Sequence, residues 1–241
     1  MINDPVPTSF NMASYVLARA GDNPTKIALA ILSEDTAECW TYAQIEAAIR
    51  GTATGLLATG LVLGDRVLLR LGNTPDFAIA FLACIAVDLI PVPTSSQLSV
   101  NEITEITIDL APKAIIAADH ITLPDYPASV IDTAKLISFY SLPPVDFIYG
   151  DANRAAYIIF TSGTTGRSKG VAVRHTSLAN YCNSAAQTLG LTASDRALQV
   201  TSPAFDLGYT TAFGLLAVGG ACHWIGAVAA VDPNRILQEM S

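Results

Sequence analysis

Charged residues are scarce in this sequence. Asp, Glu, Lys and Arg together make up 14% of the 241 residues, well below the quarter that is typical of globular proteins. The formal net charge is −8, and no basic face is visible, so general nucleic-acid binding is excluded. So few charges predict that part of the surface is covered by a missing half, a partner subunit or a membrane.

Cysteine patterns that hold metals are also missing. No CxxC pair or Cys/His cluster occurs, and the four cysteines lie far apart in apolar segments. We expect reduced core thiols, no metal site and a cytoplasmic protein. The N-terminus lacks a basic region followed by an apolar run, so no signal peptide is expected. The cysteines are Cys39, Cys84, Cys182 and Cys222.

One stretch, from Leu207 to Val231, has no charged residue at all and is long enough on paper to span a bilayer. Gly214, Gly219, Gly220, Gly226 and His223 interrupt it. The pattern instead predicts a buried helix over Leu207–Val218, a stop at Gly219–Gly220 and a buried strand over Ala221–Ile225. No membrane span is expected.

Short β-branched runs alternate with helical patterns along the chain, which predicts an α/β fold with layered, mostly parallel sheets flanked by helices. Two capping boxes, at Thr41–Gln44 and Ser99–Glu102, predict helix starts. Thr74 followed by Pro75 predicts another, and Asp232-Pro233 opens the last. The predicted strands are Lys26–Ile31, Arg66–Leu71, Ile90–Val92, Lys113–Ala117, Ala156–Thr161, Gly170–Val173 and Ala197–Thr201.

The segment TSGTTGRSKG, residues 161–170, joins two of these strands. Bare backbone N–H groups, hydroxyls and a lysine suit a polyphosphate. The Walker loop is excluded because Lys169 does not directly follow Gly166 and because a strand, not a helix, is expected next. The alternative is an ordinary turn, since turns are rich in Gly and Ser.

The same segment closely resembles the signature of the adenylate-forming superfamily, which includes acyl-CoA synthetases, amino-acid-activating domains of peptide synthetases and luciferases. The resemblance extends along nearly the whole chain, through WTYAQIEAAIRGTATGLLATGLVLGDRVLL, NTPDFAIAFLACIAVDLIPVP and DRALQVTSPAFDLGYTTAFGLLAVGG. It implies that a carboxylic acid is activated with ATP and Mg²⁺ to an acyl-adenylate. A thiol of coenzyme A or a phosphopantetheine arm then takes the acyl group.

The resemblance also implies which residues contact ATP. Lys169 and Thr161 are the predicted catalytic residues, since positioning and charge stabilisation carry reactions of this type. Arg167 and Ser168 occupy variable positions in the signature. The predicted ATP-binding set is Thr161, Ser162, Gly163, Thr164, Thr165, Gly166 and Lys169.

Phe205 and Asp206 are the predicted substrate-binding residues, and two interpretations of Asp206 stay open. The family's amino-acid activators carry Phe-Asp at this position, where the aspartate meets the ammonium group of the substrate. Alternatively, Asp206 only caps the helix expected over Leu207–Val218. The earlier part of the chain reads more like an acyl- or aryl-CoA ligase. His175, after the loop, is expected to make a structural hydrogen bond.

Several family features are absent from the sequence, and we expect it to be a truncated large N-terminal domain of the acyl-CoA-synthetase-like fold. No lysine follows Lys169, and no Tyr-Gly-x-Thr-Glu segment occurs. By the resemblance, the family's second catalytic lysine, its ribose-binding aspartate and its small C-terminal domain are expected to be absent. Residues 51–175 are predicted to form one lobe, with 1–50 and 176–241 forming parts of another. The predicted function is an ATP-dependent carboxylate-activating ligase, inactive as this chain alone. The alternatives are an amino-acid adenylation domain that loads a carrier protein, and a non-catalytic truncated module.

Overall fold

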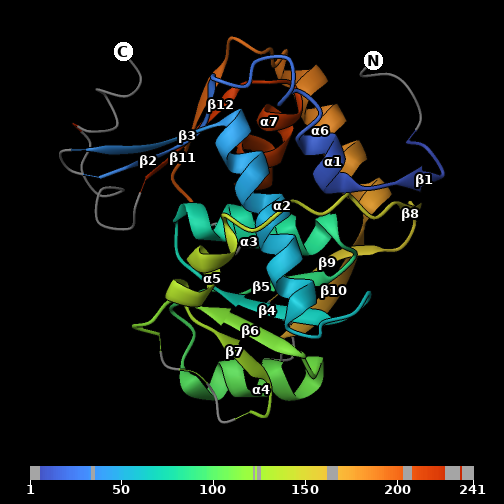
Figure 1. The fold of residues 1–241 in the computed structure, drawn as a ribbon, viewed down its shortest axis with the longest axis vertical. Coiled ribbons are helices and arrows are strands. Elements are labelled where there is room, and N and C mark those ends of the chain that lie inside the picture. The colour runs from blue at the N-terminus through green and yellow to red at the C-terminus, as the bar shows by residue number, and fades with distance from the viewer. Residues whose placement is uncertain are drawn as a thin grey trace.

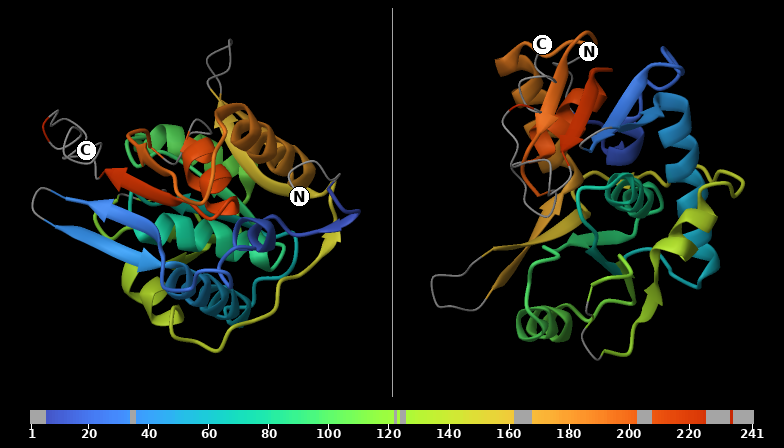
Figure 2. Two further views of the ribbon diagram at one scale, coloured as in Figure 1. Left: turned by 90° about the horizontal axis from the view of Figure 1, so that it is seen from above. Right: turned by 90° about the vertical axis from the view of Figure 1, so that its left-hand side faces the viewer.

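The computed structural model describes residues 6–33, 36–121, 123, 126–161, 168–202, 208–225 and 234. It confirms the predicted α/β architecture (Figure 1). Two four-stranded sheets are separated by a layer of helices, and two antiparallel strand pairs, β1–β8 and β9–β10, complete the described strands. Figure 2 shows the same layers from two further directions.

The first sheet, called the β2 sheet, has the order β11-β12-β2-β3. Its first three strands are mutually parallel, and β3 runs antiparallel to β2. The sheet therefore unites two early strands with two late ones. Its strands are β2 (Ile27–Leu32), β3 (Ala37–Thr41), β11 (Arg196–Gln199) and β12 (Ala221–Ile225).

The second sheet, called the β4 sheet, is wholly parallel and has the order β5-β4-β6-β7. Helix α4 (Val100–Leu110) covers one face, where Ile103, Ile106 and Leu110 pack against Leu68 and Ile115. The strands of this sheet are β4 (Arg66–Arg70), β5 (Ile90–Pro93), β6 (Ala114–Ala117) and β7 (Ser129–Ile131). All except the edge strand β7 are the largely buried runs expected of a parallel sheet.

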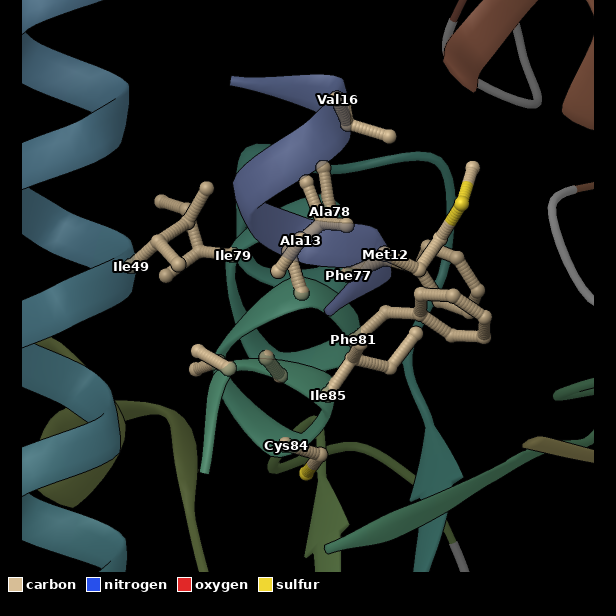
Figure 3. Packing of buried hydrophobic residues seen from close by; sticks show 14 of the residues in the cluster. Met12, Ala13, Val16, Ile49, Phe77, Ala78, Ile79, Phe81, Cys84 and Ile85 are labelled. Carbon is tan, nitrogen blue, oxygen red and sulfur yellow. The ribbon is translucent and has the colours of Figure 1, made fainter. Parts of the chain in front are cut away.

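Helix α3 (Pro75–Ala86) lies at the centre of the molecule, and all of its residues except Asp76 are buried. A helix that is apolar on every side must be covered on every side. Figure 3 shows Met12, Ala13 and Val16 of α1 (Met12–Val16) on one flank and Ile49 of α2 (Tyr42–Ala58) on another. The main apolar core therefore surrounds α3.

The helix starts that depend on local sequence form as predicted. Thr41 and Ser99 both make complete capping boxes, at the start of α2 and α4. Pro75 opens α3, but the Thr74 side chain makes no capping bond, and its hydroxyl is buried without a hydrogen-bond partner among the described residues. The helix expected at Asp232-Pro233 lies outside the described residues.

A polar network attaches the N-terminal segment to the core. The Asn11 amide nitrogen donates to the carbonyls of Ile85, at 2.9 Å, and Ile148, at 2.8 Å. Nearby, the Arg154 guanidinium donates to the Asp88 carboxylate at 2.5 Å and to the Phe10 carbonyl at 2.8 Å. Strand β1 (Ser9–Phe10) pairs with β8 (Gly150–Asp151) beside this network. A partly buried cation that bonds both carboxylate and backbone holds distant segments together.

Several features differ from the sequence-based expectations. Strands β1, β3, β7 and β8 were not predicted, because their residues are largely polar or exposed. In place of one helix over Leu207–Val218, the described part of this range has the π-helix η2 (Thr210–Gly214) followed by α7 (Leu215–Ala217). Cys39 is exposed and so is not a core thiol, whereas the other three cysteines are buried.

The strand and the stop predicted at the end of the charge-free stretch form as predicted. The strand expected over Ala221–Ile225 is β12, and Gly219 has a φ of 87°, which suits the predicted stop. Within the described part of the chain, no helix is long and apolar enough to cross a membrane. The proposed division into lobes at residues 51 and 175 remains a prediction.

Candidate functional site

The Gly/Thr/Ser-rich loop connects β9 (Ala155–Thr161) to β10 (Lys169–Arg174), so a strand lies on each side of it as predicted. The two strands are antiparallel, and Thr161 pairs with Lys169 at the end nearest the loop. Both residues are exposed. The structure therefore brings together the two predicted catalytic residues, at the base of the predicted phosphate loop.

The middle of the loop is not described. The predicted ATP-binding residues Ser162, Gly163, Thr164, Thr165 and Gly166 lie outside the described residues, together with Arg167. Their roles remain predictions. The described residues show instead how the two ends of the loop are held.

Packing of β9 fixes the base of this loop. Strand β9 lies against β5, and the side chains of Ile158 and Phe160 pack against the apolar cluster of the β4 sheet. Gly170 is the register partner of Phe160, and a Cβ atom there would lie 3.2 Å from the ring carbon Cζ. Glycine at this position leaves space for the Phe160 ring, which anchors the antiparallel pair of β9 and β10. We call this pair the β9–β10 ribbon.

The charge at the tip of the ribbon is positive. Lys169 makes no ion pair with any described residue, and no acidic residue occurs in β9 or β10. Arg174, the other cation of the ribbon, is at the opposite end of β10. The Lys169 ammonium group is therefore able to meet an anion from outside the chain, and a phosphate is an anion of this kind.

His175 is a structural residue, as expected. It begins α6 (His175–Leu189), is buried, and its Nδ1 accepts a hydrogen bond from the Met12 N–H at 3.1 Å. Burial, assisted by the charge of Arg154, lowers the pKa of His175 to about 4. Six residues of strand separate it from the loop, which is roughly 20 Å. It takes no part in the phosphate site.

Phe205 and Asp206, the predicted substrate-binding residues, lie outside the described residues. The structure describes the two flanks of their segment. On the C-terminal flank, the Tyr209 ring contacts Tyr157 of β9, with ring centroids 5.3 Å apart, and Phe213, at 4.9 Å. Because Tyr157 and Thr161 belong to the same strand, this aromatic contact joins β9, which leads into the predicted phosphate loop, to the C-terminal flank of the predicted substrate segment.

Two amide side chains near this segment were not predicted from the sequence. Gln199, at the end of β11, is buried and contacts both flanks of the segment. Asn73, from the loop before α3, donates to the carbonyls of Thr201 and Ile225. A polar residue at the end of an apolar strand was the available signal for Gln199. No local signal in the sequence indicates Asn73, because its hydrogen-bond partners are more than 120 residues away.

No described residues form a ready-made metal site. Among them, no group of three His, Cys, Asp or Glu side chains could hold an ion. Among the described residues, the charge that this site offers to a ligand is the exposed Lys169 ammonium group, which suits an anion.

Comparison with known proteins identifies the family. The sequence matches the AMP-binding enzyme family over residues 16–241. The chain belongs to this family of adenylate-forming enzymes.

Individual relatives show both similarity and difference in length. The hybrid PKS-NRPS synthetase xenE of Xenoacremonium sinensis is 30% identical over 198 residues, covering 79% of this chain but 5% of that protein. A fatty acyl-adenylate ligase from L. pneumophila, solved with acyl adenylate and pyrophosphate, has a TM-score of 0.82 at 22% identity, covering 95% of this chain and 42% of the other. The N-terminal subdomain of NpsA from Klebsiella oxytoca, solved with 3-hydroxyanthranilyl-AMSN, gives 0.83 at 22%, covering 95% and 57%.

These two solved structures establish the fold. The chain spans a twentieth of the first relative and about half of each solved chain. The ligands in those two structures were bound by those proteins.

Proposed function

We propose that this chain is the N-terminal part of an ATP-dependent carboxylate-activating ligase, similar to acyl- and aryl-CoA ligases. The observation that carries the proposal is the pairing of Thr161 with Lys169 at the two ends of the TSGTTGRSK loop. Membership of the AMP-binding family supports it. The fold is also that of a ligase solved with acyl adenylate and pyrophosphate.

The proposed reaction has two steps. A carboxylate oxygen of the acid attacks the α-phosphorus of ATP, and the bond to the β-phosphate oxygen breaks, releasing pyrophosphate. A thiolate then attacks the acyl carbonyl, and AMP leaves with the electrons of the carbon–oxygen bond. Lys169 and the loop N–H groups are proposed to stabilise charge on the β- and γ-phosphates in the first step. Mg²⁺ is proposed to arrive with ATP, bound to its phosphates.

The acceptor thiol is proposed to be that of coenzyme A or of a phosphopantetheine arm. A second candidate function, amino-acid activation for a carrier protein, is favoured by the similarity to a hybrid PKS-NRPS synthetase. The Phe205–Asp206 pair in the sequence agrees with that candidate. We also propose a cytoplasmic location, which the free, buried thiols of Cys84, Cys182 and Cys222 support.

Carboxylate-dependent exchange of pyrophosphate into ATP tests the proposal. The assay is run on residues 1–241 and on a longer protein that continues the same chain, with acyl, aryl and amino acids in parallel. We expect exchange in the longer protein and none in residues 1–241, because the ribose and adenine contacts implied by the resemblance are not in this sequence. If no acid supports exchange in the longer protein, the ligase proposal fails and a non-catalytic module is left.

A further inference from the structure

Gln199 connects the two flanks of the segment that carries Phe205 and Asp206. Its side chain is 2% exposed. On the N-terminal flank, its amide nitrogen donates to the Thr201 carbonyl at 3.4 Å. On the C-terminal flank, its amide oxygen lies 3.0 Å from the Thr211 hydroxyl. One buried side chain therefore contacts residues on both sides of the segment.

The C-terminal flank is shaped around this amide. The Thr211 hydroxyl also lies 2.9 Å from the Gly208 carbonyl, so its single proton is shared between two acceptors. A Cβ atom at Gly208 would lie 2.4 Å from the Gln199 amide nitrogen. Any larger residue at position 208 would displace the Gln199 side chain.

Asn73 adds a second amide from a distant part of the chain. Its side-chain nitrogen donates to the Ile225 carbonyl at 3.0 Å and to the Thr201 carbonyl at 3.4 Å. The Thr201 carbonyl thus accepts from both amides. We call Asn73 and Gln199 together the amide clasp. It joins the ends of β11 and β12 to the start of the central helix α3.

The clasp has a physical reason to hold its geometry. If the hydrogen bonds of the buried Gln199 amide broke, the amide would have neither these partners nor water, so breaking them is unfavourable. Conformations of the flanks that break the clasp are disfavoured accordingly. A binding segment whose ends are fixed also loses fewer conformations when a ligand binds, which improves affinity without any new ligand contact.

We propose that Asn73 and Gln199 are positioning residues for the carboxylic acid substrate. They touch neither substrate nor ATP, and they act by fixing the flanks of the segment that carries Phe205 and Asp206. This inference rests on the proposed function. It predicts that the clasp determines the Michaelis constant for the acid. The Michaelis constant for ATP should change little, because the predicted ATP-binding loop lies between β9 and β10, away from the clasp.

The first test measures the flanks themselves. Hydrogen–deuterium exchange is followed in residues 1–241 for the parent chain, Gln199→Leu and Asn73→Ala. We expect peptides covering residues 200–211 to exchange at least tenfold faster in both variants, and peptides of the β4 sheet to be unchanged. Gln97→Leu, an exposed glutamine in the loop before α4, is the matched control and should resemble the parent. Unchanged exchange over residues 200–211 in both clasp variants would overturn the proposal.

The second test measures acid activation in the longer protein. We expect Gln199→Leu and Asn73→Ala to raise the Michaelis constant for the acid about tenfold, with the constant for ATP and kcat changed less than threefold. A variant that merely folds poorly would lower the active fraction and leave both constants unchanged. An unchanged acid constant in the two variants overturns the inference and leaves the ligase proposal standing. If no acid supports pyrophosphate exchange in the parent protein, both this inference and the ligase proposal are overturned.

Gly208→Ala keeps the test informative if Gln199→Leu does not fold. The added methyl group should displace the Gln199 amide and reproduce the higher acid constant. In the double variant Gln199→Ser/Gly208→Ala, the shorter side chain removes the steric conflict but cannot form the clasp. We expect the double variant to recover the melting temperature and to keep the raised acid constant. Recovery of the parent acid constant would contradict a positioning role.

Discussion

Thr161 and Lys169 are register partners across the β9–β10 ribbon and are the last described pair on either side of the loop. Strand pairing therefore holds an exposed ammonium group beside the end of a loop rich in backbone N–H groups. The position of this charge depends on the ribbon, and the charge itself contributes little to the apolar core.

Lys169→Ala should weaken pyrophosphate exchange in the longer protein far more than it weakens folding. Loss of one charge-assisted contact to phosphate is expected to cost about 1.5–3 kcal/mol, roughly tenfold to a hundredfold in rate. The measurement compares exchange rates with melting temperatures. If both are unchanged, Lys169 is not part of the site.

Asp206→Asn separates the two interpretations of that residue. We expect little change in stability or in activation of acyl and aryl acids, because asparagine caps a helix about as well as aspartate. The assay compares amino acids with the matching des-amino acids in parent and variant. Strong amino-acid-dependent exchange that disappears in Asp206→Asn would instead identify an ammonium contact, for which a loss of roughly 3–5 kcal/mol is typical.

His175 should make folding sensitive to acid. Its pKa of about 4 in the folded protein lies below the value of about 6.5 for an unfolded histidine. As the pH falls below 6.5, the unfolded chain binds a proton that the folded chain does not, so stability decreases until about pH 4. The full effect is about 3 kcal/mol. Above pH 6.5 this residue contributes no pH dependence.

Urea unfolding between pH 4 and pH 7 measures the effect of His175. In His175→Asn, the side-chain oxygen can still accept from the Met12 N–H, but the group no longer titrates. Carboxylates titrate in both proteins, so the comparison is the difference between them. We expect the parent to lose more stability than the variant over this range. Parallel curves would contradict the assignment.

Gly55→Ala should destabilise the fold although alanine is the better helix former. A Cβ atom at this position of α2 would lie 2.2 Å from Cγ of Phe139, in α5 (Thr133–Phe139). Overpacking of this kind costs about 1–3 kcal/mol, against a gain of about 1 kcal/mol from helix propensity. Chemical denaturation is the measurement. Gly21→Ala is the control, because nothing lies within 4 Å of its Cβ position, and Gly55→Ala/Phe139→Leu should recover part of the loss.

Features that depend on neighbouring residues were predictable from the sequence, and features that depend on distant contacts were not. Both capping boxes formed because each needs only four consecutive residues. Strand β3 was missed because its residues are mostly exposed and because it is defined by pairing with β2. The loop signature predicted a strand–loop–strand unit. The loop between Thr161 and Lys169 is too short for a parallel crossover, so the antiparallel direction of β9 and β10 follows once the two strands pair.

Around the predicted substrate segment, too, features that depend on distant contacts could not be predicted from the sequence. The charge-free pattern predicted one helix over Leu207–Val218, but composition does not distinguish a π-helix from an α-helix, and η2 was missed. Gln199 and Asn73 meet at the Thr201 carbonyl across 126 residues of sequence. Such a meeting is a product of the fold, and no local pattern carries it.

The strand order of the β2 sheet has a consequence for how the chain is made. Strand β2 lies between β3, completed by residue 41, and β12, which begins at residue 221. Likewise, the hydrogen bond from the Met12 N–H to His175 Nδ1 cannot form until His175 has been synthesised. Strand β2 is therefore synthesised long before its parallel neighbour, and its edge stays unpaired until residues 221–225 have been made. Such long-range pairing slows folding and exposes the nascent chain to aggregation, so translation rate and chaperone contact over this interval will govern the yield of folded protein.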